Sequence, residues 1–137
     1  MKPILLRHGR IIDPANRRDE VGDLLLVDGR IADQSAIRNP QSAIEEIDAT
    51  GLIVAPGLID LHVHFREPGQ SAKETIASGA RCAAAGGFTS VVAMPNTSPT
   101  VDSPSVVTWI LEKAKAEACV NVFASGEIGR ASCRERV

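Results

Sequence analysis

The pattern of apolar and polar positions divides the chain into two parts. Up to about residue 52, the apolar residues form short runs such as Ile4–Leu6, Ile11–Ile12 and Leu24–Val27, with polar residues between them. Beyond Leu52, apolar strands alternate with longer segments of helical spacing. Short runs bounded by turn residues are typical of β-strands, and strands that alternate with helices are typical of a parallel sheet. The pattern therefore predicts an α/β protein that begins with a small β segment.

Turn residues place the strands of the first part. Asp13-Pro14 closes the second apolar run, and Asp28-Gly29 suits a type I′ hairpin turn, in which both central residues need a positive φ. Arg30–Ala32 is then the return strand. We expect a further strand through Ile47, which Thr50-Gly51 turns toward the second part.

Three strands and two helices are predicted in the second part. The strands are Leu58–His64, Thr89–Met94 and Val120–Ala124. Ser71 and Glu74 have the spacing of a capping box, and the first helix is expected to end at Gly86-Gly87.

The second helix is expected to begin with Ser103 as its N-cap and Pro104 as its first residue. One apolar face follows a 3.6-residue spacing and consists of Val107, Ile110, Leu111, Ala114 and Ala118. This βαβαβ order favours a parallel three-stranded sheet.

Composition changes this interpretation little, but it excludes several classes of protein. The chain has 137 residues, of which 44% are hydrophobic, and a net charge of −2 without a basic stripe, so we expect no nucleic-acid partner. No apolar run is long enough for a membrane span. Cys82, Cys119 and Cys133 form no disulfide framework, which favours a reduced, cytoplasmic setting. We interpret Cys82 and Cys119 as small packing residues.

The strongest chemical signal is the pair His62 and His64. On a strand, residues i and i+2 point to the same side, so both imidazoles would project from one face. Such a pair is either two solvent-facing histidines or two ligands of zinc or a similar ion. Arg66 follows two residues later and could bind a carboxylate in a bidentate manner. Asp60 shares the face, where it could orient a histidine or bind only backbone.

The motifs around this pair carry a family resemblance. Pro56–His64 resembles the entry strand of the amidohydrolase superfamily, and the continuation is similar to dihydroorotases of the long bacterial type. That continuation consists of Phe65–Gln70, Lys73–Thr75, Ala84–Thr89 and Met94–Thr97. The resemblance reaches from the start of the chain to about Glu127. It implies the first part of a (β/α)8 barrel, about three strands and two helices, preceded by a small N-terminal β segment.

The resemblance also implies roles for four residues. His62 and His64 match the first two metal ligands, for one or two Zn²⁺ ions, and Arg66 and Asn96 match residues that hold the substrate's carboxylate. Taken alone, Asn96 is better explained as a turn residue of the Pro-rich segment around it; together with Arg66, we favour the ligand-binding role. The implied reaction is the reversible, metal-dependent hydrolysis of dihydroorotate to N-carbamoyl-aspartate in de novo pyrimidine biosynthesis.

The family's remaining ligands and its acid/base aspartate come from later strands, so we expect no catalytic residue within this chain. A complete barrel needs about 250 residues. We therefore expect three ranges: 1–52 as the β segment, 53–127 as the first part of the barrel, and 128–137 as a non-native tail. One back-translation of that tail resembles a common sequencing-adapter read, which suggests an assembly artefact joined to a truncated gene. We expect such a fragment to be inactive alone.

Two other interpretations stay open. Another cyclic amidase, an allantoinase or hydantoinase, would share the His-x-His strand, although Arg66 suits an anionic ring better. A non-catalytic homologue that associates with aspartate carbamoyltransferase would belong to a different class, but such homologues tend to lose the metal ligands. In the complete enzyme, the resemblance allows association with that transferase or a homo-oligomer.

Overall fold

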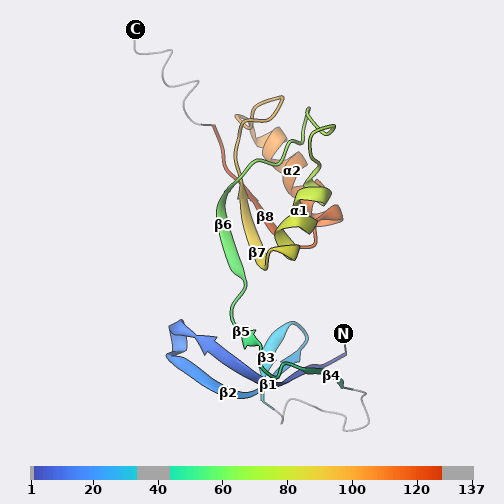
Figure 1. Ribbon diagram of the computed structural model, residues 1–137. Helices are drawn as coiled ribbons and strands as arrows, with labels where there is room; N and C mark the ends of the chain where they lie inside the picture. The colour runs from blue at the N-terminus through green and yellow to red at the C-terminus, as the bar shows by residue number, and fades with distance from the viewer. Residues whose placement is uncertain (1, 34–43, 128–137) are drawn as a thin grey trace. The chain divides into compact units, whose positions relative to one another are not determined.

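The computed structural model describes residues 2–33 and 44–127, and the tail expected at 128–137 lies outside this range. The chain divides into two compact units, one ending at Pro56 and the other beginning at Gly57. Figure 1 draws both, and each is described by itself. Among the described helices, none is long and apolar enough to cross a membrane.

The first unit is a mixed five-stranded sheet. Its strands are β1 (Ile4–Asp13), β2 (Arg18–Val27), β3 (Arg30–Ala32), β4 (Glu45–Asp48) and β5 (Ile53–Val54), with a short 3₁₀ helix η1 (Pro14–Asn16) between β1 and β2. The strand order is β3-β2-β1-β4, and β5 also pairs with β1. The β1–β2–β3 meander is antiparallel, whereas β4 and β5 run parallel to β1.

Turn chemistry in this unit agrees with the sequence. Asp28 (φ 49°) and Gly29 (φ 75°) both have the positive φ that the predicted type I′ turn requires. The register of β1 against β2 is interrupted between Leu6 and Gly9. His8 adopts φ 61° at this bulge, and its amide donates to Asp23 Oδ1 at 2.9 Å. The His8 side chain is exposed.

The second unit is a parallel sheet with both helices on one face (Figure 1). Its elements are β6 (Leu58–Val63), α1 (Ile76–Ala85), β7 (Phe88–Ala93), α2 (Pro104–Glu117) and β8 (Asn121–Ala124). The strand order is β6-β7-β8, and both pairings are parallel. The predicted βαβαβ arrangement is confirmed, and with it the α/β fold class: the start of a (β/α)8 barrel after a small β segment.

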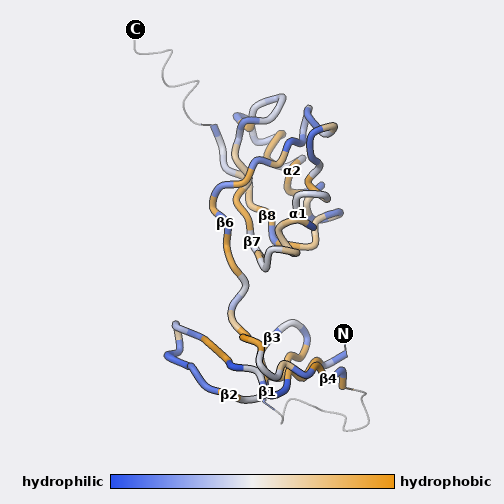
Figure 2. Tube along the Cα trace, in the orientation of Figure 1, coloured by the Kyte–Doolittle hydropathy of each residue, from blue (hydrophilic) through white to orange (hydrophobic). Residues whose placement is uncertain are grey.

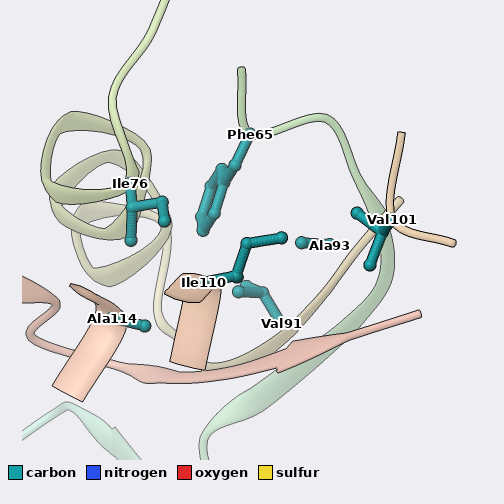
Figure 3. Packing of buried hydrophobic residues seen from close by; sticks show 7 residues of the cluster. All are labelled: Phe65, Ile76, Val91, Ala93, Val101, Ile110 and Ala114. Carbon is teal, nitrogen blue, oxygen red and sulfur yellow. The ribbon is translucent and has the colours of Figure 1, made fainter. Parts of the chain in front are cut away.

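The core of the second unit lies between the sheet and the helices. Figure 3 shows its buried residues, which come from the loops, both helices and β7: Phe65, Ile76, Val91, Ala93, Val101, Ile110 and Ala114. Apolar residues also dominate β6, β7 and β8 along the chain (Figure 2). The Phe65 ring packs so close to α1 that a Cβ on Gly79 would collide with it, which explains a glycine inside this helix.

The predicted capping box was wrong. α1 begins at Ile76, and its N-cap is Thr75, whose hydroxyl accepts the Ser78 amide proton at 3.0 Å. Ser71 lies in a turn instead, which the hydrogen bond from Lys73 N to Gln70 O closes. Tertiary contacts of the loop before the helix therefore override the local capping signal.

Three other local expectations need correction. Cys82 and Cys119 are exposed, so they are not packing residues of the core. Ser103 does occupy the N-cap of α2, but its side chain makes no capping hydrogen bond and lies 3.1 Å from Ser105 Oγ. Leu111, expected on the buried face of α2, is 42% exposed.

Replacing Ile76 with alanine is expected to lower the free energy of unfolding of the second unit by about 2–5 kcal/mol, because the side chain is fully buried. Urea denaturation followed by the fluorescence of Trp109, the single tryptophan, measures this change. Leu61→Ala removes a side chain that is 71% exposed and should shift the free energy by about 0.5 kcal/mol or less. Equal effects of the two substitutions would contradict the assigned core.

Candidate metal and substrate site

Two imidazoles meet where β6 ends. His62 lies in the strand, and His64 directly follows its last residue. Because the two histidines are two positions apart, their side chains leave the backbone on the same side. Their Nε2 atoms lie 3.2 Å apart, and the rings meet edge to face with centroids 5.0 Å apart. Both residues are exposed. The predicted pair is therefore assembled as the strand periodicity requires.

The distance between the two Nε2 atoms fits a shared metal ion. Nitrogen ligands at about 2.0–2.1 Å from a tetrahedral zinc ion lie about 3.3 Å from each other. The 3.2 Å separation of His62 Nε2 and His64 Nε2 corresponds to one edge of such a tetrahedron. Within residues 2–33 and 44–127, no three His, Cys, Asp or Glu side chains gather around one point. The described residues thus offer half of a tetrahedral ligand set.

Asn96 brings the loop after β7 to this pair. Its Oδ1 atom lies 2.9 Å from His64 Nδ1, across 32 positions of sequence. An amide oxygen can only accept, so Nδ1 of His64 carries the proton in this contact. The Nε2 atom that faces His62 then holds a lone pair, which is the tautomer that binds a metal ion.

Asp60 acts on the backbone of the same strand. Its Oδ1 atom accepts the amide proton of His62 at 2.9 Å. Of the two roles considered for Asp60, the structure displays the bond to backbone. This bond holds the segment in which the β6–β7 register is interrupted, between Asp60 and Val63.

Arg66 stands apart from the other three residues. It is half-buried, and within the described part of the chain its guanidinium makes no hydrogen bond or ion pair. Among these residues, no hydrogen bond joins its side chain to that of Asn96. A guanidinium without a carboxylate partner is available for an anionic ligand.

The loops that carry Arg66 and Asn96 are nevertheless tied together. The amide of Ser98 donates to the carbonyl oxygen of Pro68 at 3.0 Å. Gly69, with φ 94°, passes so close to Ser98 that any Cβ there would collide with its carbonyl group. The end of β6 and the end of β7 therefore lead into one connected pair of loops.

The role of Glu67 was not predicted from the sequence. It is 7% exposed, and it is one of two buried polar or charged residues in the described chain, together with Thr97. Continued strand-like alternation offered a signal: His64 and Arg66 fall on one side, and the buried Phe65 and Glu67 on the other. A glutamate is usually solvent-exposed, so composition alone gives no reason to expect its burial.

Comparison with known proteins identifies the family of the chain. A family model described as dihydro-orotase-like matches residues 51–131. A dihydroorotase from Solibacter usitatus is 53% identical over 135 residues, which cover 98% of this chain and 31% of that protein. The chain spans about a third of the length of the curated relatives it matches.

Solved structures share the fold. An L-hydantoinase from Arthrobacter aurescens superposes with a TM-score of 0.76 at 24% identity, over 92% of this chain and 28% of the hydantoinase. A dihydropyrimidinase from Brevibacillus agri superposes with a TM-score of 0.69 at 25% identity, over 96% of this chain and 28% of that protein.

Proposed function

Since this chain belongs to the dihydro-orotase-like family, we propose that it is the N-terminal part of a dihydroorotase. The complete enzyme would hydrolyse the cyclic amide of dihydroorotate reversibly to N-carbamoyl-aspartate, in de novo pyrimidine biosynthesis. The observation that carries this proposal is the convergence of His62 and His64 at 3.2 Å, with Asn96 fixing one tautomer.

His62 and His64 would each offer an Nε2 lone pair to a divalent ion, which we propose to be Zn²⁺. Such an ion supplies Lewis-acid activation of the amide carbonyl and of a water nucleophile. Asn96 keeps the proton of His64 on Nδ1, so that the ring presents the correct nitrogen. The remaining ligands and the acid/base carboxylate would come from later strands of a complete barrel.

Arg66 and Asn96 would bind the carboxylate of the substrate. The guanidinium of Arg66, which has no hydrogen-bond or ion-pair partner among the described residues, would provide the positive charge. Asn96 retains its amide nitrogen for an anion while its oxygen accepts from His64. The loop contacts between Pro68 and Ser98 support a shared anion subsite. The charge of Arg66 favours dihydroorotate over the alternative substrates of other cyclic amidases, the neutral hydantoins and allantoin.

The setting of the enzyme is part of the same proposal. A reduced, cytoplasmic location is compatible with two exposed, unpaired cysteines, Cys82 and Cys119. The complete enzyme would form a homo-oligomer or a complex with aspartate carbamoyltransferase. A non-catalytic role is disfavoured by the intact histidine pair.

A chimeric enzyme tests the function directly. Residues 1–127 of this chain replace the matching segment of the Solibacter usitatus dihydroorotase, which supplies the rest of the barrel. We expect the purified, Zn²⁺-loaded chimera to hydrolyse dihydroorotate at least about 100-fold more efficiently than hydantoin, because only the former offers a carboxylate to Arg66.

The isolated 137-residue chain is the negative control for this experiment. It offers two metal-binding side chains among its described residues, so we expect no dihydroorotate turnover above that of its own His62→Ala variant. A chimera that prefers hydantoin would overturn the substrate assignment. Turnover by the isolated chain would show that the proposed division of the catalytic residues is wrong.

A further inference from the structure

The buried carboxylate of Glu67 has no role in the chemistry proposed above. It follows Arg66 directly, yet it points into the protein and is 7% exposed. A buried carboxylate is costly unless hydrogen bonds and positive charge compensate for its lost hydration. Its partners therefore indicate what it does.

Glu67 contacts both helices, through the first residue of α1 and a lysine of α2. Its Oε2 atom accepts the amide proton of Ile76, the first residue of α1, at 2.8 Å. The first turn of α1 contains no acidic residue of its own, so Glu67 supplies the negative charge that the helix dipole favours there. Its Oε1 atom lies 3.9 Å from Lys113 Nζ on α2.

Lys113 is well suited to this position. Its ammonium group lies 2.8 Å from Glu117 Oε1 and 5.7 Å from the centroid of the Trp109 ring. The hydrogen bond to Glu117, with the charge of Glu67, raises the pKa of Lys113, against a smaller lowering by desolvation. The lysine thus stays charged beside the buried carboxylate of Glu67.

The backbone around Glu67 is the backbone of the anion subsite. One residue before it, the carbonyl oxygen of Arg66 accepts the amide proton of Gln70 at 2.8 Å. One residue after it, the carbonyl oxygen of Pro68 accepts the amide proton of Ser98, two residues beyond Asn96. Glu67 therefore ties the loop after β6 to both helices, and the Pro68–Ser98 hydrogen bond connects that loop to the one that carries Asn96.

We propose that Glu67 is a positioning residue that holds Arg66 and Asn96 at the spacing needed to bind the substrate's carboxylate. This inference rests on the function proposed above and extends it to a residue that touches neither metal nor substrate. Because Glu67 acts through the loops, its loss should weaken carboxylate binding more than it slows the chemical step.

Glu67→Gln tests this in the chimeric enzyme, since glutamine keeps the size and one acceptor but removes the charge. We expect the KM for both dihydroorotate and N-carbamoyl-aspartate to rise about fivefold or more, with kcat within about threefold and the metal content unchanged. Glu117→Gln is the matched control: it removes the exposed partner of the same lysine and should leave both KM values unchanged.

A double variant separates positioning from loss of stability. In an Arg66→Gln background, Glu67→Gln should raise KM by a smaller factor than in the parent chimera, because one of the two groups that it positions is already absent. Additive effects, or a fall in kcat at constant KM, would overturn the proposal.

Hydrogen exchange provides a readout that needs no activity. Deuterium uptake at the Ser98 amide should be faster in Glu67→Gln than in the parent chimera and unchanged in Glu117→Gln. An inactive parent chimera with this exchange pattern would refute the proposed function and leave the anchoring intact. Unchanged exchange and unchanged KM in Glu67→Gln, in an active chimera, would refute the positioning role alone.

Discussion

Replacing His62 with alanine in the chimeric enzyme is expected to lower kcat/KM for dihydroorotate by about 10³-fold or more and to reduce the bound zinc. The physical reason is the geometry of the pair. Two Nε2 atoms 3.2 Å apart form one edge of a tetrahedral site, and alanine leaves His64 without the second nitrogen of that edge. Metal activation contributes several kcal/mol to such reactions, which sets the size of the expected loss.

Zinc content and turnover should be measured on the same preparations, with His8→Ala as the control. His8 is an exposed histidine of the first unit, so its replacement should change neither quantity. A His62→Ala variant that keeps a full complement of zinc and a kcat/KM within about tenfold of the parent chimera would contradict a ligand role.

The sequence allowed the fold of the second unit to be predicted because its signals were local and consistent. Apolar strands separated by helical spacing, with Pro104 opening one helix and Gly86-Gly87 ending the other, all indicated the same βαβαβ arrangement. The start of α1 was misjudged because Ser71 and Glu74 matched a capping box. The loop there is instead held by contacts to Glu67 and Ser98, which no local pattern encodes.

The site was predictable to the extent that it depends on strand alternation. His62 and His64 share a side of β6 because residues two apart on a strand always do. The bond between Asn96 and His64 spans 32 positions and depends on how β6 and β7 pair, so the sequence could only suggest it through the resemblance. The burial of Glu67 depends on where α1 and α2 pack, and it becomes visible only once the tertiary structure is known.

Arg66→Gln in the chimeric enzyme is expected to lower kcat/KM for dihydroorotate by about 10²–10³-fold, mostly through KM. Loss of a guanidinium that pairs with a carboxylate removes about 2–5 kcal/mol of binding, and glutamine keeps hydrogen-bonding capacity without the charge. Because Arg66 is half-buried, its charge should contribute more binding free energy than the charge of a surface arginine. Zinc content should not change, because Arg66 is no ligand.

Arg81→Gln is the matched control, since Arg81 is an exposed arginine on α1. It should leave the kinetics of dihydroorotate hydrolysis unchanged. The residual activity toward hydantoin, which offers no carboxylate, should fall less than about threefold in Arg66→Gln. The ratio of kcat/KM for dihydroorotate to kcat/KM for hydantoin therefore separates an effect on carboxylate binding from an effect on the metal site. If both activities fell together, Arg66 would act on the common chemical step, and the preference for an anionic ring would have to come from another residue.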